Sequence, residues 1–376
     1  SVTVCHDFDG VHGELLGDMD MNLKMTVQDD FCHHPDFDGH EQVIHCRDPR
    51  SGLNGFIAVH NTHLGPAMGG CRMWPYGREA DALTDVLRLS RGMTYKAALA
   101  NLEDGGGKSV IIGDPRRDKS RELLLAMGDF VDSLRGSYVI AEDSGTAVPD
   151  MRVMGERTNW VAGVLEGSEH GGDPSPSTAY GVFVGIRAAV KRRLGTESLD
   201  GMKVAIQGVG NVGYRLARLL REAGASLVVA DVYAANAERA VRELDAELAS
   251  IDEVHRSAVD VYAPCALGGA VNNQTVEEIL APVVAGAANN QLVSPAHGER
   301  LQQRGILYAP DYAINAGGVI DIASQRAGRD QRAKQRHLDA IAVTLQEIFE
   351  LADESGQTTA AVADQVAEKR FKKGKK

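Results

Sequence analysis

Two lysines and one aspartate in the first half of the chain have the side chains needed for acid–base chemistry. Lys96 lies in GMTYKAALA, Lys108 in GGGKSVII and Asp143 in AEDSGT. A carboxylate can take a proton from an amine, and a lysine shielded from water releases its proton more readily than a solvated one. Most lysines are solvated, however, and most aspartates cap loops or form salt bridges. The residues alone therefore leave structural roles open.

The lysine of GGGKS also raises the alternative of a phosphate-binding loop. The pattern GxxxxGK[ST] requires a glycine at position 102, where this chain has Leu102. A phosphate-binding loop also follows a strand and opens a helix, whereas Lys108 precedes an apolar strand. The pattern thus disfavours phosphate at Lys108. We expect glycines 105–107 to let a substrate approach the backbone instead.

A second motif predicts dinucleotide binding. Three glycines in IQGVGNVG supply GxGxxG between an apolar run and a helical segment, and Asp231 follows the next apolar run. Such glycines allow a tight turn and a close approach of backbone N–H groups to a pyrophosphate, while the acid can bind ribose hydroxyls. A carboxylate repels a 2′-phosphate, so Asp231 favours NAD over NADP. The loop residues expected at the cofactor are Gly208, Gly210, Asn211, Val212 and Gly213.

The elements that must position these residues follow from hydrophobic periodicity. Apolar runs at 43–46 and 56–59 flank a turn-rich stretch and predict a hairpin. Helical spacing predicts a helix over 82–97, and Ser120 is the predicted N-cap of another. From Met202 the order strand, glycine loop, helix, strand indicates a parallel sheet. The fold class is therefore α/β.

Composition excludes several classes of function. The net charge of −12 argues against nucleic-acid binding and against anionic membranes. No apolar stretch reaches the ~18 residues of a membrane span. The five cysteines contain no CxxC pair and the N-terminal region lacks a signal-peptide core, so we expect a cytoplasmic protein. The Cys- and His-rich FCHHPDFDGH matches no standard zinc spacing, so no metal is expected.

Several stretches together resemble the glutamate/leucine/phenylalanine/valine dehydrogenase family, and most of all its leucine/phenylalanine/valine branch. They are LGPAMGGCRMW, GMTYKAALANLEDGGGKSVIIGDP, AEDSGT, DPSPSTAYG, IQGVGNVG, DVYAPCALGG, AGAANNQL and LYAPDYAINAGGVI, spread in family order from about residue 40 to about residue 350. The resemblance implies NAD-dependent, reversible oxidative deamination of an L-amino acid to its 2-oxo acid and ammonia, by a homo-oligomer. The alternative is a catalytically silent NAD-binding regulatory module.

The resemblance also implies a domain plan for the 376 residues. Residues 1–170 would form an α/β substrate-binding, catalytic and oligomerisation domain, in which 1–22 are expected to be flexible. Residues 171–322 would form a Rossmann-type NAD-binding domain across a cleft. Residues 323–376 would be C-terminal helices that pack back toward that cleft.

Residue roles carry over from the matching motifs. Lys108 and Asp143 would be the catalytic acid–base groups, with Asp143 exchanging a proton with the amino group. The substrate-binding residues would be Lys96, Gly69 and Gly70 at the carboxylate end, Asn289, and the apolar pocket residues Met68, Ala141, Ala162, Val319 and Ile322. Beyond the glycine loop, the cofactor would contact Thr178, Cys265, Ala266, Asn289 and Asn315.

The expected pocket indicates an apolar substrate. Glutamate-specific members carry a lysine where this chain has Met68, and methionine would leave a buried substrate carboxylate unpaired. Branched-chain amino acids such as leucine and valine are favoured, with aromatic ones such as phenylalanine next. One methylene group is worth only about 1–3 kcal/mol, so the two kinds of substrate stay open.

Overall fold

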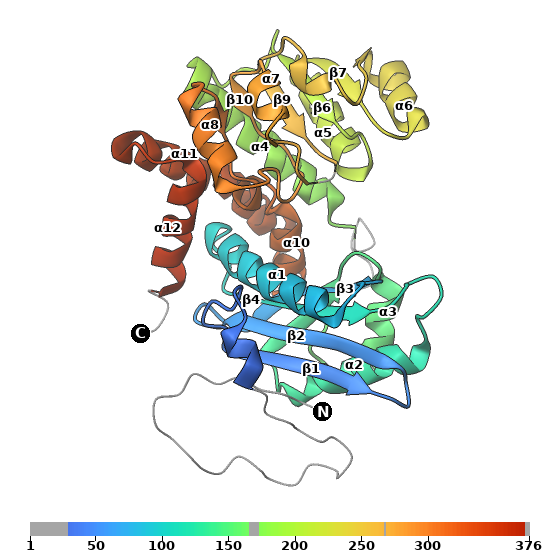
Figure 1. Ribbon diagram of the computed structural model, residues 1–376. Helices are drawn as coiled ribbons and strands as arrows, with labels where there is room; N and C mark the ends of the chain where they lie inside the picture. Colours follow the sequence, from blue (N-terminus) through green and yellow to red (C-terminus); the bar gives the residue numbers. More distant parts are fainter. Residues whose placement is uncertain (1–28, 165–172, 267, 373–376) are drawn as a thin grey trace. The chain divides into compact units, whose positions relative to one another are not determined.

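The computed structural model describes residues 29–164, 173–266 and 268–372 (Figure 1). The predicted flexible segment 1–22 lies outside the described residues. The chain divides into two compact units, one before the gap at 165–172 and one from Asp173 to Arg370, with Phe371 and Lys372 grouped with the first. The α/β class and the parallel sheet predicted from the sequence are confirmed.

The first unit is built on a five-stranded sheet in the order β1-β2-β4-β3-β5. The predicted hairpin is the antiparallel pair β1/β2, β2 pairs antiparallel with β4, and β3 runs parallel to both β4 and β5. Its strands are β1 (Gln42–Asp48), β2 (Leu53–Asn61), β3 (Ala67–Trp74), β4 (Gly105–Ile112) and β5 (Tyr138–Glu142). Its helices are η1 (Asp29–His33), α1 (Glu79–Leu99), α2 (Arg121–Ser133) and α3 (Val148–Met154).

Both faces of this sheet are buried because neighbouring residues of each strand point to opposite sides. Val110 packs with Val86 and Leu87 of α1, whereas Ile111 packs with Met127 of α2. Accordingly α1 covers one face and α2 and α3 the other (Figure 1). The predicted N-cap of α2 is confirmed, since the Ser120 side chain accepts a hydrogen bond from Leu123 N at 3.1 Å.

The second unit has a six-stranded parallel sheet in the order β11-β10-β9-β6-β7-β8. Its strands are β6 (Lys203–Gln207), β7 (Ser226–Ala230), β8 (Glu247–Leu248), β9 (Val261–Pro264), β10 (Val283–Val284) and β11 (Leu307–Tyr308). The helices that precede the last strand are α4 (Ser175–Leu194), α5 (Asn211–Glu222), α6 (Ala234–Leu244), η2 (Val254–Arg256), α7 (Thr275–Glu278) and α8 (Pro295–Gln303).

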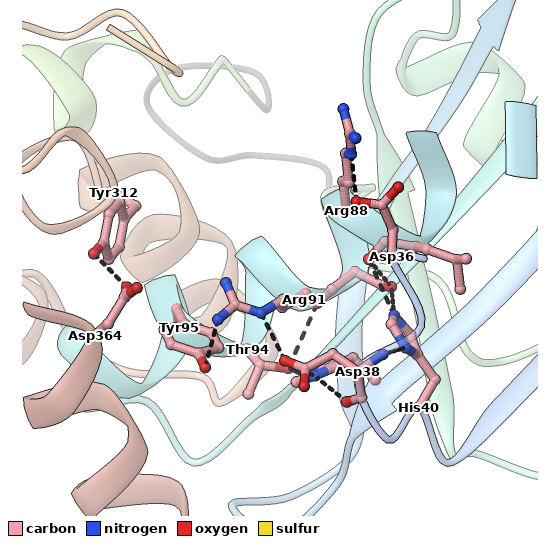
Figure 2. A network of polar contacts seen from close by, with 12 residues as sticks. Asp36, Asp38, His40, Arg88, Arg91, Thr94, Tyr95, Tyr312 and Asp364 are labelled. Atoms are coloured by element: carbon pink, nitrogen blue, oxygen red, sulfur yellow. Dashed lines mark hydrogen bonds and ion pairs between the residues drawn. The ribbon is translucent and has the colours of Figure 1, made fainter. Parts of the chain in front are cut away.

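The rest of the second unit is helical. It comprises α9 (Asp311–Ile314), α10 (Gly317–Arg326), α11 (Gln331–Ser355) and α12 (Thr359–Lys372), the last ending just beyond the unit. Tyr312 of α9 donates a hydrogen bond to Asp364 of α12 at 2.6 Å (Figure 2). Among the helices of the described ranges, none combines the length and apolarity that a membrane span requires.

Candidate active site

Lys108 and Asp143 meet at one face of the five-stranded sheet. Lys108 lies on β4, Asp143 follows β5, and the Lys108 Nζ is 2.7 Å from the Asp143 Oδ2. The lysine side chain is 8% exposed and the aspartate side chain 22%, so water screens this ion pair only weakly. The solvated-lysine alternative therefore does not hold for Lys108.

β3 lies between β4 and β5, and its Gly70 has no side chain that would block the contact. Gly70 of β3 pairs with Ala141 of β5, and a Cβ added at Gly70 would lie 2.7 Å from the Asp143 Cβ and 2.6 Å from the Glu142 backbone oxygen. Any larger residue at position 70 would therefore displace the aspartate. Gly70, expected at the substrate carboxylate, lies directly beside the Lys108–Asp143 pair.

Strand alternation places Met68 and Ala141, two of the other expected pocket residues, on the same sheet face as the pair. Met68 and Gly70 point to the same face of β3, and Met68 pairs with Gly106 of β4 and Val139 of β5. Met68 and Ala141 are buried, at 3% and 4% exposure. Ala162 is also buried, and its N–H donates to the Ile140 oxygen at 2.8 Å at the outer edge of β5.

The loop after β5 fixes the Asp143 backbone. The Asp143 N–H donates to the Thr146 Oγ1 at 3.0 Å, and that hydroxyl donates to the Cys71 carbonyl of β3 at 2.8 Å. One hydroxyl thus ties the aspartate to the neighbouring strand. Sequence reasoning missed Thr146, although the hydroxyl of EDSGT three residues after the acid is a typical turn-forming signal.

A second missed residue is Arg72, two positions after Gly70 on the same face of β3. Its Nε lies 3.4 Å from the Asp143 Oδ2, and its Nη1 donates to Asp85 of α1 at 2.9 Å. The two-residue period of the strand, counted from Gly70 in GGCRM, could have found it.

The charges at the site keep Asp143 ionised. Burial alone would raise the pKa of its carboxyl, but the Lys108 ammonium and then the Arg72 guanidinium outweigh burial, and the pKa is lowered from its usual value. Asp143 is therefore a carboxylate at neutral pH and can accept a proton.

Lys96 lies in the last turn of α1, whose position is fixed by a polar network (Figure 2). Arg91 bonds Asp38 at 2.7 Å and donates to Tyr95 at 2.8 Å, and His40 Nε2 bonds the Leu87 oxygen at 3.0 Å. Two histidines of the cluster considered for zinc thus anchor this helix, His40 and also His34, whose Nε2 bonds the Thr84 Oγ1 at 3.1 Å. Across the described ranges, no group of three or more His, Cys, Asp or Glu side chains is arranged to hold a metal ion.

Glycines 105–107 do not form the open approach expected for a substrate. They begin β4 itself, and a Cβ added at Gly106 would lie 2.1 Å from the Thr94 N of α1. A Cβ at Gly107 would lie 2.7 Å from the Tyr138 ring. These glycines therefore let α1 and Tyr138 pack closely on the two faces of the sheet, and the expectation was wrong because neighbouring protein occupies the space.

In the second unit the glycine loop has the predicted context. It joins β6 to α5, which begins at Asn211, with Val212 next. A Cβ at Gly213 would lie 1.9 Å from the Gly208 oxygen, so the helix packs close to the strand, whereas a Cβ at Gly210 would meet nothing within 4 Å. Asp231 follows β7 and accepts from the Val209 N–H at 2.8 Å. This loop fits a dinucleotide.

The expected amide pair also comes together in this unit. Asn315 Nδ2 donates to the Asn289 Oδ1 at 2.8 Å and to the Ala287 oxygen at 3.1 Å. Within the described ranges, the buried Asn315 Oδ1 has no hydrogen-bond partner, which leaves one acceptor for a bound ligand. Thr178, in the first turn of α4, packs against Gly318 of α10.

The remaining expected residues lie at separate places of the second unit. Cys265 follows β9 and is half-buried, and its N–H donates to the Gln207 oxygen at 2.8 Å. Ala266 packs on the glycine loop, since a Cβ at Gly208 would lie 2.7 Å from the Ala266 Cβ. Val319 and Ile322 are half-buried on α10.

Comparison with known proteins now decides the family. The Glu/Leu/Phe/Val dehydrogenase dimerisation domain matches residues 40–161, and the Glutamate/Leucine/Phenylalanine/Valine dehydrogenase domain matches residues 171–235 and 232–370. The chain belongs to this family. It is an amino-acid dehydrogenase with a nucleotide-binding domain of the kind that uses a nicotinamide cofactor, and the resemblance noted in the sequence is confirmed.

Its relatives fall in the expected branch. The chain is 46% identical over 334 residues to leucine dehydrogenase of Bacillus subtilis (strain 168), covering 89% of this chain and 92% of that protein. It is 48% identical over 342 residues to valine dehydrogenase of Streptomyces virginiae, covering 90% and 95%. The crystal structure of L-tryptophan dehydrogenase from Nostoc punctiforme superposes with a TM-score of 0.80 at 44% identity, covering 90% and 97%.

Proposed function

We propose that this protein catalyses the NAD-dependent, reversible oxidative deamination of an apolar L-amino acid to its 2-oxo acid and ammonia. The observation that carries the proposal is the Lys108–Asp143 pair, 2.7 Å apart and shielded from water on one sheet face. The buried, apolar side chains of Met68 and Ala141 share that face.

The chemistry assigns each group a task. Asp143 accepts a proton from the substrate ammonium, because the α-amine must be neutral before hydride leaves Cα. Bound NAD supplies the hydride acceptor. Lys108 takes a proton from the water that adds to the resulting imine and returns a proton as ammonia departs. Lys96 holds the substrate carboxylate as an ion pair.

The apolar residues expected to line the pocket support a substrate without a charged side chain. Met68, Ala141 and Ala162 are each under 5% exposed and offer no charge. A substrate side-chain carboxylate buried there would lack a partner, at a cost of several kcal/mol. We therefore place branched-chain amino acids first and aromatic ones second.

The dinucleotide loop supports NAD as the cofactor. Gly208, Gly210, Asn211 and Gly213 would hold the pyrophosphate, and Asp231 would bind the adenosine ribose. A carboxylate at that position repels the 2′-phosphate of NADP, so NAD is preferred. The match of residues 40–161 to a dimerisation domain supports a homo-oligomer, which light scattering of the purified protein tests.

A substrate panel tests the proposal. The purified protein is mixed with NAD, or with NADP, and a series of L-amino acids at alkaline pH, and the absorbance of the reduced cofactor is followed. We expect turnover with NAD and leucine or valine, and with phenylalanine if the pocket admits a ring. A protein that binds NAD yet turns over no amino acid would instead be the silent binding module.

Lys108→Ala tests the residue assignment. We expect turnover to fall by about 10²–10⁴-fold, the usual contribution of a general acid–base group, while NAD affinity is retained. The control is Lys119→Ala, which removes a lysine of the same unit that pairs with Asp150 at 2.7 Å. Equal activity of the two variants would remove Lys108 from the mechanism.

A further inference from the structure

Two cations, not one, converge on the same oxygen of Asp143. The Lys108 Nζ lies 2.7 Å from the Oδ2, and the Arg72 Nε lies 3.4 Å from it. Considering only the described residues, the Arg72 Nε and the Asp143 Oδ2 are both buried and lack a partner in hydrogen-bond geometry. What joins Arg72 to the aspartate is therefore charge attraction in a weakly screened place.

Arg72 is itself held from the other side. Its Nη1 donates to the Asp85 Oδ2 at 2.9 Å, and the same oxygen accepts from the Tyr76 hydroxyl at 2.5 Å. The guanidinium is planar and rigid, so this second anchor on α1 fixes the edge that faces Asp143. Tyr76, Asp85 and Arg72 form a chain that ends at the proposed proton acceptor.

The two cations differ in one chemical respect. An arginine stays protonated in proteins, whereas a lysine that acts as a base must lose its proton during the reaction. When Lys108 is neutral, the attraction that keeps Asp143 ionised falls to Arg72. Lys108 must lose its charge to act as a base, and Asp143 needs a nearby positive charge to stay ionised. A permanent charge on Arg72 allows both.

Three other titratable groups near Asp143, namely Cys71, Tyr138 and Asp150, are neutral or paired. Burial raises the pKa of the Cys71 thiol to about 12, and burial raises the pKa of the Tyr138 hydroxyl well above its usual value, so both are neutral at working pH. Asp150 of α3 is paired with Lys119. In the part of the chain that the structure describes, Arg72 on β3 and Lys108 on β4 form ion pairs with the carboxylate.

We propose that Arg72 is a positioning residue for deamination, a permanent charge that keeps Asp143 ionised while Lys108 is neutral. This inference rests on the proposed function. Arg72 acts through Asp143 and needs no contact with the substrate, so its effect belongs to the pH dependence of the reaction.

The test is the pH profile of kcat/KM for Arg72→Gln, with NAD and the best amino acid of the panel. The acid limb reports the group of the free enzyme that must be deprotonated. An opposite charge this close lowers a carboxyl pKa by about 1–3 units, so we expect the limb to move to higher pH by about one unit. Arg72→Lys keeps the charge on a shorter arm and should give an intermediate limb. Arg78→Gln, which removes an exposed arginine that pairs with Asp81, should leave the limb in place.

Each outcome decides a different point. A merely structural role would lower thermal stability or the plateau rate without moving the limb, and an unmoved limb overturns the inference. Should Arg72→Gln fail to fold, Arg72→Lys decides alone, because a lysine cannot span Asp85 and Asp143 as the guanidinium does. Absence of turnover in the unaltered protein would instead refute the proposed function.

Discussion

Replacing Gly70 with alanine perturbs the site by one methyl group. The new Cβ would lie 2.6 Å from the Glu142 oxygen and 2.7 Å from the Asp143 Cβ, whereas ordinary contacts begin at 3.4 Å. The end of β5 must therefore recede by about 0.7 Å, which is the kind of backbone shift that overpacking forces.

Two magnitudes follow from this displacement. Overpacking of a tight core costs about 1–3 kcal/mol of unfolding free energy. A catalytic group misplaced by about 1 Å loses about 100-fold in rate, so we expect kcat/KM of Gly70→Ala to fall by roughly that factor. The fall should exceed what the stability loss explains, because Asp143 leaves Lys108 while the protein remains folded.

The assay compares Gly70→Ala with Gly77→Ala. A Cβ at Gly77 would meet nothing within 4 Å, so this control should change the unfolding free energy by less than about 0.5 kcal/mol and leave turnover intact. Urea unfolding gives the stability of each variant and initial rates give kcat/KM. Unaltered turnover in Gly70→Ala would refute the argument that this glycine sets the place of Asp143.

Two further outcomes follow from the same unit. Thr146→Val removes the hydroxyl that joins the Asp143 N–H to the Cys71 oxygen. We therefore expect the unfolding free energy, measured by urea unfolding, to fall by about 1–3 kcal/mol, and kcat to fall as well. Unaltered stability and kcat would contradict that role of Thr146. Burial lowers the pKa of His60 to about 3, so the folded state binds fewer protons than the unfolded state between about pH 6.5 and pH 3. The unfolding free energy should therefore decrease as the pH is lowered through that window, and His60→Gln should make this decrease smaller. Equal dependence of the unfolding free energy on pH in the two proteins would exclude His60 as the source.

Much of the fold could be predicted because its signals are local. Helical spacing gave α1, the Ser120 N-cap gave the start of α2, and the glycine motif with Asp231 gave the nucleotide loop. The extent of β4 could not be predicted from its glycines, since what fills the space beside Gly106 is Thr94 of a helix earlier in the chain. That packing depends on contacts between distant segments, which no local pattern encodes.

In the candidate site too, local motifs identify residues but do not predict the contacts between distant segments. Lys108 and Asp143 were found from their motifs, but their contact depends on strand order, because β3 enters between β4 and β5. Arg72 was missed for the same reason. Its distance from Asp143 follows from the register of β3 against β5, and its second partner, Asp85, comes from the helix above the sheet.

Along β3, the wall of the proposed pocket and the charge beside Asp143 belong to different positions. Selection can therefore change the two independently. Position 68 carries a side chain of the proposed pocket, position 70 carries none, and position 72 carries charge toward Asp143. An exchange at Met68 alters the shape or polarity of the proposed pocket four positions away from Arg72 on the same strand, and it changes neither Lys108 nor Asp143. If the proposed pocket and proton acceptor are as assigned, substrate range can diverge through single changes at position 68, while Lys108, Asp143 and Arg72 are inherited unaltered.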